Sequence, residues 1–401
     1  MNLLFLTLLK IPSIDERGIY TDLLREFKKN GHSITVVFPL ERRFKQKTSF
    51  YNKEGVTYLG VKTLNIQKTN IIEKGLGTVL LEYQYNYAIK RYLRNIHFDL
   101  IVYSTPPITF TTVIRDLKKL NNKANTYLLL KDIFPQNAVE MGMLSEKSVL
   151  YKFFRRKEIS LYKMSNVIGC MSPANVNYIL EHNPYLSPDK VEVCPNSIEP
   201  NESRENVNGQ TLRIKYNIPE GKKLAIYGGN LGKPQGIHFL LDVIDSNKNN
   251  HNLHFLIIGS GTEFKRIKNW FINNHPNNAT LIPSLPKEEF DQIITIADIG
   301  LIFLDPIFTI PNFPSRLLSY LENKIPVIAA TDSNTDLGST LLEGNMGFWC
   351  ISGDLDKFND YLNTLLQDDN RRQIMGKNGY TYLLRNYTSK HSYEIIIKHF
   401  N

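Results

Sequence analysis

The sequence predicts an α/β protein built from two Rossmann-like halves, in which short buried strands alternate with helices. The chain has 401 residues, which is too long for one ordinary domain and suits two. Short apolar runs typical of buried strands recur in both halves, each followed by a segment with apolar residues at helical spacing. In the middle of the chain, a glycine-rich turn at residues 227–236 joins such a strand to such a helix.

In the first half the pattern predicts strands at 2–9, 33–38, 98–103, 126–130, 167–171 and 191–194. The predicted helices are 19–29, 80–94, 110–120, 148–164 and 173–182. Three loops that follow predicted strands carry small or polar residues, namely Gly18, Thr105 with Pro106, and Lys131 with Asp132. In a doubly wound sheet such loops line the ligand crevice, so these residues are candidates for a binding site.

The polar run 199–210 predicts a linker between the halves. After it the pattern predicts strands at 223–227, 254–258, 280–282, 299–304 and 326–329. The predicted helices are 237–244, 262–273, 287–296, 316–323, 355–366, 370–385 and 389–400. Ser315 stands directly before one of these helices and is a candidate N-cap.

The glycine-rich turn has the chemistry of a phosphate-binding loop. Its glycines allow the backbone to approach a ligand closely, and the helix that follows presents free N–H groups and a partial positive charge. Lys233 adds a full positive charge. The turn lacks both the Gly-Lys-Ser/Thr ending of a P-loop and the G-x-G-x-x-G pattern, so by itself it also fits an ordinary tight turn.

The positive charge is concentrated in the first half. Residues 1–195 hold 28 Lys and Arg against 17 Asp and Glu, an excess of +11, whereas the whole chain carries +9. This asymmetry favours an anionic surface or ligand for the first half, and no nucleic-acid-binding module is evident. Two stretches are basic and also contain aromatic residues. Residues 41–47 fit either a solvated loop or a contact with a membrane surface, and residues 148–164 fit either an ordinary packed helix or a second such contact.

The sequence gives no sign of export or of a membrane span. No apolar run approaches the roughly 18 residues that a spanning helix needs. The first ten residues lack the basic region and the cleavage site of a signal peptide, and read as a first strand. Cys170, Cys194 and Cys350 are far apart without metal-ligand spacing, as expected for a reduced cytoplasmic protein.

Five short motifs occur along the chain in a characteristic order: Thr105-Pro106-Pro107, Lys131-Asp132-Ile133-Phe134-Pro135, Pro195-Asn196-Ser197, Gly229-Asn230-Leu231-Gly232-Lys233-Pro234-Gln235-Gly236 and Pro314-Ser315-Arg316. This order and spacing resemble those of GT-B glycosyltransferases. The pattern is most similar to the retaining family 4 enzymes, in the polysaccharide subgroup that includes bacterial N-acetylfucosaminyl transferases. The resemblance implies two Rossmann-like domains that face each other across a cleft, with the C-terminal helix crossing back to the N-terminal domain.

The resemblance also implies a division of labour. An acceptor-binding domain would comprise residues 1–197 together with 386–401, and a nucleotide-sugar-binding domain residues 198–385. By position in the motifs, Thr105 and Pro106 would contact the acceptor. The implied donor-binding residues are Gly18, Gly229, Asn230, Lys233, Gln235, Gly259, Gly261, Ser284, Ser315, Arg316, Ser319 and Glu322. Among them Asn230, Lys233 and Gln235 would face the diphosphate, and Ser315 and Arg316 would hold phosphate oxygens.

The sequence departs from the family where two glutamates are expected. Pro311 and Ser319 occupy their places, counted back from the helix-closing Pro326. Glu322 lies one helical turn beyond Ser319 and either substitutes for the second glutamate or is an ordinary solvated helix residue. The wider family also has Arg and Lys where Asn230 and Gln235 stand here.

Lys131 and Asp132 are the expected catalytic residues. Lys131 occupies the place of a family histidine that touches the transferred sugar, and Asp132 would order the loop or help to deprotonate the acceptor. A surface ion pair is the alternative interpretation of both. No Asp-x-Asp stands on a loop where a metal could bridge phosphates, so the expected reaction needs no metal or other cofactor.

The resemblance implies a retaining transferase that moves a sugar from a nucleotide-sugar donor to a saccharide on a polyprenyl diphosphate. UDP is the expected nucleotide, with an N-acetyl amino sugar as one option, and the expected role is capsule or O-antigen synthesis. The expected location is cytoplasmic, peripheral at the anionic inner face of the plasma membrane; the oligomeric state stays open. The alternative is a catalytically silent GT-B partner of another glycosyltransferase, supported by the missing glutamates. An epimerase would need clustered acids and histidines that the sequence lacks.

Overall fold

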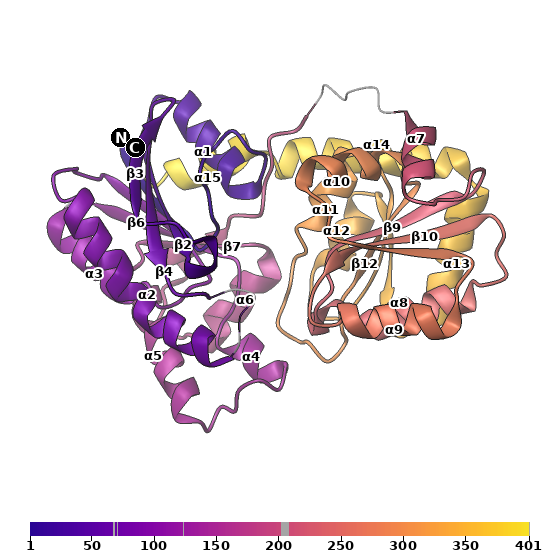
Figure 1. Cartoon of the computed structure of the whole chain (residues 1–401), viewed down its shortest axis with the longest axis horizontal. Helices are drawn as coiled ribbons and strands as arrows, with labels where there is room; N and C mark the ends of the chain where they lie inside the picture. The colour runs from indigo at the N-terminus through magenta and orange to yellow at the C-terminus, as the bar shows by residue number, and fades with distance from the viewer. Residues whose placement is uncertain (67–68, 70, 123, 202–207, 401) are drawn as a thin grey trace. The chain divides into compact units, whose positions relative to one another are not determined.

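The structure is a computed structural model, and it describes residues 1–66, 69, 71–122, 124–201 and 208–400. The chain divides into two compact units (Figure 1). Unit 1 comprises Met1–Glu199 and Ser389–Asn401, and unit 2 comprises Pro200–Thr388. Each unit is an α/β layer structure built on its own sheet, with a separate hydrophobic core. Part of the predicted linker, residues 202–207, lies outside the described residues.

Unit 1 contains an eight-stranded sheet in the order β3-β4-β2-β1-β5-β6-β7-β8. All neighbouring strands pair in parallel except β3, which is antiparallel to β4. The strands are β1 (Asn2–Leu6), β2 (Ser33–Glu41), β3 (Ser49–Lys53), β4 (Val56–Thr63), β5 (Leu100–Ser104), β6 (Asn125–Leu130), β7 (Val167–Cys170) and β8 (Val191–Val193). The six strands from β4 to β7 in this order are mostly buried, and their largely apolar sequences are typical of strands covered on both faces, whereas the edge strands β3 and β8 are more exposed.

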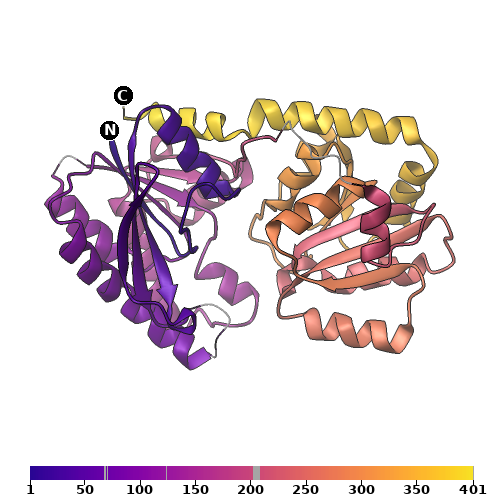
Figure 2. The ribbon, with the colours of Figure 1, turned by 45° about the horizontal axis from the view of Figure 1, so that its top comes forward.

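Helices cover the sheet of unit 1 in two groups. Helix α1 packs against the C-terminal helix α15, which returns the chain to unit 1 (Figure 2). Helices α2, α3 and α5 pack in a row. The helices are α1 (Ile19–Lys29), α2 (Ile71–Tyr92), α3 (Thr111–Leu120), α4 (Gln136–Glu140), α5 (Val149–Met164), α6 (Pro173–His182) and α15 (Ser389–Ile397), with short 3-10 turns η1 (Arg42–Phe44) and η2 (Pro188–Lys190).

The region between β2 and β5 differs most from the sequence-based prediction. Helix α2 begins nine residues before the predicted start at residue 80, and strands β3 and β4 were not predicted. Glycine lowers helix propensity, and Gly75 and Gly77 obscure the first turns of α2. A side chain at Gly77 would lie 2.9 Å from the carbonyl oxygen of Asn65, so this glycine allows the helix to pack closely on the preceding loop.

Unit 2 contains a six-stranded, fully parallel sheet in the order β11-β10-β9-β12-β13-β14. The strands are β9 (Lys223–Asn230), β10 (Leu253–Ser260), β11 (Ala279–Pro283), β12 (Ile299–Phe303), β13 (Val327–Thr331) and β14 (Gly347–Ile351). The helices are α7 (Gly209–Lys215), α8 (Ile237–Ser246), α9 (Phe264–Asn274), α10 (Lys287–Ile293), α11 (Arg316–Glu322), α12 (Leu337–Glu343), α13 (Leu355–Gln367) and α14 (Asp369–Asn386), with 3-10 turns η3 (Lys233–Gln235) and η4 (Ile294–Ile296). The prediction missed α7, α12 and β14.

The strand order of unit 2 reverses between β9 and β12, which makes this the topological switch point of the sheet. The two strands pair at Ile299 and Gly300, near the amino end of β12. Beyond them the hydroxyl of Tyr320 lies 3.1 Å from the carbonyl oxygens of both Ile226 on β9 and Leu301 on β12. Ligands of open α/β sheets bind at the carboxyl ends of the strands at such a point, so the loops after β9 and β12 are the expected location of a binding site.

Candidate functional site

The glycine-rich turn follows β9 at this switch point. The chain leaves the strand at Asn230, makes the short turn η3 and enters α8 through Gly236. Gly236 has a φ of +54°, and a side chain there would lie 2.9 Å from the carbonyl oxygen of Leu304, so glycine is required. The N–H of Asp305 donates to the carbonyl of Pro234 at 3.0 Å, which ties the loop after β12 to the turn.

Gly259 lies near the end of β10 and Gly261 just after it, and both of these predicted nucleotide-binding glycines lie against the chain of the glycine-rich turn. A side chain at Gly259 would lie 2.0 Å from the carbonyl oxygen of Gly229, and one at Gly261 would lie 2.4 Å from the backbone of Leu231. The N–H of Leu231 also donates to the carbonyl of Ser260 at 2.9 Å. These glycines therefore hold the loops after β9 and β10 against each other, and the structure gives them a packing role that needs no ligand.

Arg316 is the centre of the polar cluster at the switch point. Its guanidinium lies over the ring of Tyr227, 4.2 Å from the ring centroid. Nη2 donates to Oε1 of Gln235 and lies 3.5 Å from the carbonyl oxygen of Asn230. Nη1 is buried and has no hydrogen-bond partner among the described residues. A buried charged donor without a partner is costly unless a ligand satisfies it, so this nitrogen is a candidate contact for an anion.

The predicted diphosphate-facing residues divide into two groups. Asn230 and Lys233 are exposed within the turn, as a ligand contact requires. Gln235 is buried, and its Oε1 accepts from Arg316 and lies 3.3 Å from the hydroxyl of Tyr227. The side chain of Gln235 therefore points into the protein and orients Arg316. The sequence pattern could not distinguish this role from direct contact with a ligand.

The residues on and before α11 fit the prediction less well. Ser315 occupies the N-cap position of α11, but its exposed side chain makes no capping hydrogen bond, so that part of the prediction was wrong. Ser319 is partly buried on α11. Glu322 is buried and accepts a hydrogen bond of 2.9 Å from the N–H of Asn201. The solvated interpretation of Glu322 is therefore wrong, and its carboxylate holds the chain where it enters unit 2.

The remaining predicted residue of unit 2 is Ser284, which is exposed directly after β11. Unit 2 thus gathers Asn230, Gln235 and Arg316 by direct contacts, with Gly229, Gly259 and Gly261 beneath them. Gly18, Thr105, Pro106, Lys131 and Asp132 belong to unit 1.

In unit 1 the loops after β5 and β6 are joined by Thr105. Its buried hydroxyl oxygen accepts from the N–H groups of Lys131, at 3.0 Å, and Asp132, at 3.3 Å. Pro106 is exposed next to it. Thr105, Lys131 and Asp132 therefore form one structural cluster at the carboxyl edge of the sheet, with Pro106 beside it.

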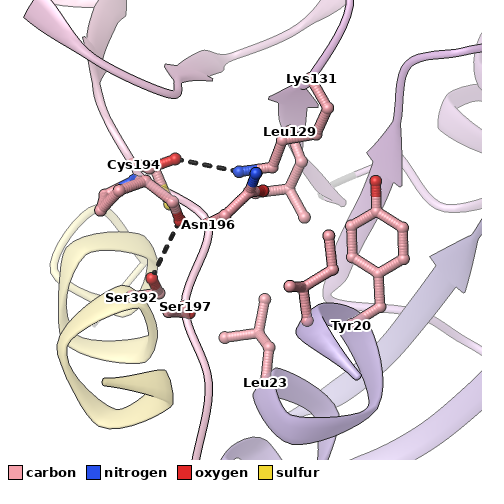
Figure 3. A pocket seen from close by; sticks show the side chains of 10 residues that line it. Tyr20, Leu23, Leu129, Lys131, Cys194, Asn196, Ser197 and Ser392 are labelled. Atoms are coloured by element: carbon pink, nitrogen blue, oxygen red, sulfur yellow. Dashed lines mark hydrogen bonds between the residues drawn. The ribbon is translucent and has the colours of Figure 1, made fainter. Parts of the chain in front are cut away.

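Lys131 and Asp132 do not pair with each other on the surface. The ammonium of Lys131 donates to the carbonyl of Cys194 at 3.1 Å, and burial lowers the pKa of Lys131 (Figure 3). Oδ1 of Asp132 accepts from the side chain of Asn137, yet burial raises the pKa of Asp132 to about 6. The surface ion-pair interpretation is therefore wrong. A carboxyl group with a pKa close to neutrality is suited to proton transfer.

Lys131 lines a small pocket with about 220 Å³ of empty space (Figure 3). Tyr20 and Leu23 of α1 form one wall, and residues 194–197 form another. Asn196 is nine-tenths buried, and its Oδ1 has no hydrogen-bond partner among the described residues. Neither Tyr20 nor Asn196 was predicted as a site residue, although Asn196 lies in one of the motifs. Gly18 precedes α1, where its N–H donates to Oδ1 of Asp22 at 2.9 Å.

The described residues contain no group of three or more His, Cys, Asp or Glu arranged to hold a metal ion. Within the same residues, no helix is both long and apolar enough to cross a membrane.

The chain is similar to known proteins in both sequence and fold. Residues 209–382 match the family described as glycosyl transferases group 1. The probable glycosyltransferase WbjE of Pseudomonas aeruginosa is 22% identical over 343 residues, 84% of this chain and 82% of WbjE. WcaI of Escherichia coli K12, whose name assigns it to colanic acid biosynthesis, is 22% identical over 60% of this chain and 59% of its own. The structure of Anabaena HepE in complex with UDP and glucose superposes with a TM-score of 0.71 at 15% identity, covering 100% of this chain and 99% of HepE.

The family match covers the glycine-rich turn and Arg316, and the structural match extends over both units. The chain therefore has the GT-B fold and is a glycosyltransferase, with a group 1 glycosyl transferase domain at residues 209–382.

Proposed function

We propose that the chain transfers a sugar, with retention of anomeric configuration, from a UDP-linked donor to a lipid-linked saccharide in bacterial surface polysaccharide synthesis. The choice of UDP is supported by HepE, which was solved with UDP and glucose. The polysaccharide role is supported by WcaI and its assignment to colanic acid biosynthesis. The relatives named as glycosyltransferases favour an active enzyme over a silent partner protein.

The observation that carries this proposal is the cluster around Arg316. An anion placed at the glycine-rich turn would satisfy Nη1, which no described residue partners, and would lie near exposed Lys233. When the bond between the sugar and the diphosphate breaks, negative charge grows on the diphosphate. Fixed cationic and N–H donors stabilise that charge and so lower the barrier.

In this proposal Lys131 and Asp132 act on the transferred sugar and the acceptor. The amine of Lys131, held by the carbonyl of Cys194, orients the sugar or its departing phosphate. Asp132 is mostly ionised above its pKa of about 6 and accepts the proton of the acceptor hydroxyl as the new glycosidic bond forms. The diphosphate leaves with the electrons of the bond that breaks. No metal or other cofactor takes part in the proposed reaction.

The first experiment measures binding and donor use by the whole chain. We expect micromolar or tighter binding of UDP in calorimetry, weaker binding of GDP, and slow hydrolysis of at least one sugar from a panel of UDP sugars. Proton NMR of the product with a saccharide acceptor then reports the anomeric configuration. No binding of any nucleotide would refute the assigned donor site, and an inverted product would refute retention.

We further propose that the enzyme is cytoplasmic and works as a peripheral protein at the anionic inner face of the plasma membrane. The excess charge of +11 in residues 1–195 supports this location, since Lys and Arg near an anionic leaflet contribute about 1 kcal/mol each.

A further inference from the structure

Large apolar side chains gather on the outer face of α2. Leu76, Val79, Leu80, Tyr83 and Tyr87 are between 43% and 71% exposed. They follow one another at intervals of three, one, three and four residues, which places them on one stripe of the helix. Exposed apolar side chains scattered singly are normal, but a contiguous stripe of five marks an interaction surface.

The opposite face of α2 is also apolar and is packed against unit 1. Leu81, Tyr85, Ala88 and Ile89 are buried, and the hydroxyl of Tyr85 donates to the carbonyl of Thr7 at 2.8 Å. These contacts fix the rotation of the helix, so the outer stripe cannot turn inward. A helix that is apolar on both sides is ordinarily covered on both sides, and here the described residues supply no second cover.

The first turns of α5 extend the stripe. Val149, Leu150 and Phe153 are 84%, 52% and 38% exposed. Lys157, one turn after Phe153, forms an ion pair of 2.5 Å with Glu82 of α2, and the two helices lie together in Figure 1. We call these eight side chains the α2–α5 surface: Leu76, Val79, Leu80, Tyr83, Tyr87, Val149, Leu150 and Phe153.

Exposed cations flank the α2–α5 surface. Lys152 and Arg156 are exposed on α5, three residues from Val149 and Phe153 respectively and therefore on adjoining positions of the helix. On the other side, Nη2 of Arg42 lies 2.8 Å from Oε1 of Glu73 in the first turn of α2. The loop that Arg42 begins also carries the exposed Lys45 and Lys47.

The other two basic residues in the middle of α5 are structural. Arg155 pairs with buried Glu158 at 2.6 Å and donates to the side chain of Asn183. Lys157 is held by Glu82. Of the three consecutive basic residues at 155–157, only Arg156 is exposed, so the interpretation of the whole run as a membrane contact was too broad.

The location of the surface fits an acceptor that is carried by a lipid. Strands β2, β5 and β6 belong to the parallel part of the sheet, so the segments that leave their carboxyl ends start at one edge. Arg42 follows β2, Thr105 follows β5, and the pair Lys131 and Asp132 follows β6. A surface bound near this edge would be close to the predicted acceptor residues.

We propose that the α2–α5 surface lies on an anionic lipid bilayer, with its tyrosines at the level of the headgroups and Lys152, Arg156, Lys45 and Lys47 against lipid phosphates. Tyrosine is favoured at such interfaces because it presents an apolar ring and a polar hydroxyl. A second copy of the chain fits less well, since a two-fold interface would bring the same cations against each other. This inference rests on the proposed function in that the acceptor is lipid-linked.

The test is sedimentation of the full chain with phosphatidylcholine vesicles that contain 0 or about 30% phosphatidylglycerol, at low and high salt. We expect binding to the anionic vesicles at low salt and release at high salt. The variant Leu76→Ser, Val79→Ser, Tyr83→Ser should bind at least about tenfold more weakly, because three apolar side chains no longer enter the interface. A matched control in unit 2, Ile214→Ser, Ile272→Ser, Leu342→Ser, alters three side chains of similar exposure, 73%, 55% and 61%, and should bind like the wild type.

Three results would overturn the assignment: wild-type protein that ignores anionic vesicles at low salt, a triple α2 variant that binds them unchanged, or a wild-type dimer in sedimentation velocity that this variant converts to a monomer. Calorimetric titration with UDP separates this inference from the proposed function. Normal UDP affinity in the triple α2 variant shows that its unit 2 is folded. Vesicle binding by a wild type that binds no nucleotide would refute the donor site and leave the membrane surface standing.

Discussion

Replacing Arg316 by alanine should weaken UDP binding without weakening the fold. The guanidinium is already held by Oε1 of Gln235 and by the ring of Tyr227, so little side-chain freedom remains to be lost when an anion binds. A charged hydrogen bond is worth about 1.5–3 kcal/mol, which corresponds to a loss of affinity of about 10- to 150-fold. The variant loses the contacts with Gln235 and Tyr227 but also removes Nη1, which is buried without a partner among the described residues; these effects oppose each other, so the melting temperature of the free protein should change little.

A double-mutant cycle tests whether Gln235 acts through Arg316. Gln235→Leu removes the acceptor that orients the guanidinium and should cost about 1 kcal/mol of UDP binding in calorimetry. If Gln235 only positions Arg316, the double variant should bind UDP no more weakly than Arg316→Ala alone, because the two effects are not additive for coupled residues. Arg371→Ala, which removes an exposed arginine of unit 2, is the control for net charge. Unchanged UDP affinity in Arg316→Ala, or fully additive losses in the double variant, would refute this assignment.

Three further predictions concern the fold and the reaction. Burial raises the pKa of Asp132 to about 6, above its unfolded value near 4. The contribution of the protonated carboxyl to stability is therefore present below pH 4 and is lost as the pH rises through 6. Asp132→Asn should raise the free energy of unfolding by up to about 3 kcal/mol at pH 8 and by nothing near pH 4, which denaturant titrations at both pH values will check. Gly259→Ala should abolish UDP binding because the new methyl group would meet the carbonyl of Gly229. By contrast, Gly75 lies on an open helix surface, so Gly75→Ala should stabilise the folded protein by about 0.5–1 kcal/mol in thermal melts. Sugar transfer should persist in EDTA, and a strict requirement for added Mg²⁺ or Mn²⁺ in the transfer assay would contradict the metal-free reaction.

Local sequence signals were sufficient for much of the fold. The predicted helices 19–29 and 173–182 coincide with α1 and α6. The start of α6 is encoded locally, because Ser172 caps the N–H of Asn175 and Pro173 occupies the first turn. The alternation of strands and helices likewise predicted two α/β halves and the order of their loops, and the resemblance of the five motifs implied the GT-B fold. The local signal is too weak to predict an element in two cases. Glycines interrupt the start of helix α2, and strand β4 forms mainly by pairing with β2.

The candidate site divides in the same way. The sequence by itself determined which loops carry it, because a strand's end and the glycine-rich turn after it are readable from a few neighbouring residues. Only the tertiary structure decided what each side chain does. Gln235 holds Arg316, Glu322 holds Asn201, and Lys157 holds Glu82, all through contacts between residues 75 or more positions apart. The exposed stripe of α2 also emerged only in three dimensions, since an apolar residue on a helix reads the same in sequence whether the protein covers it or not.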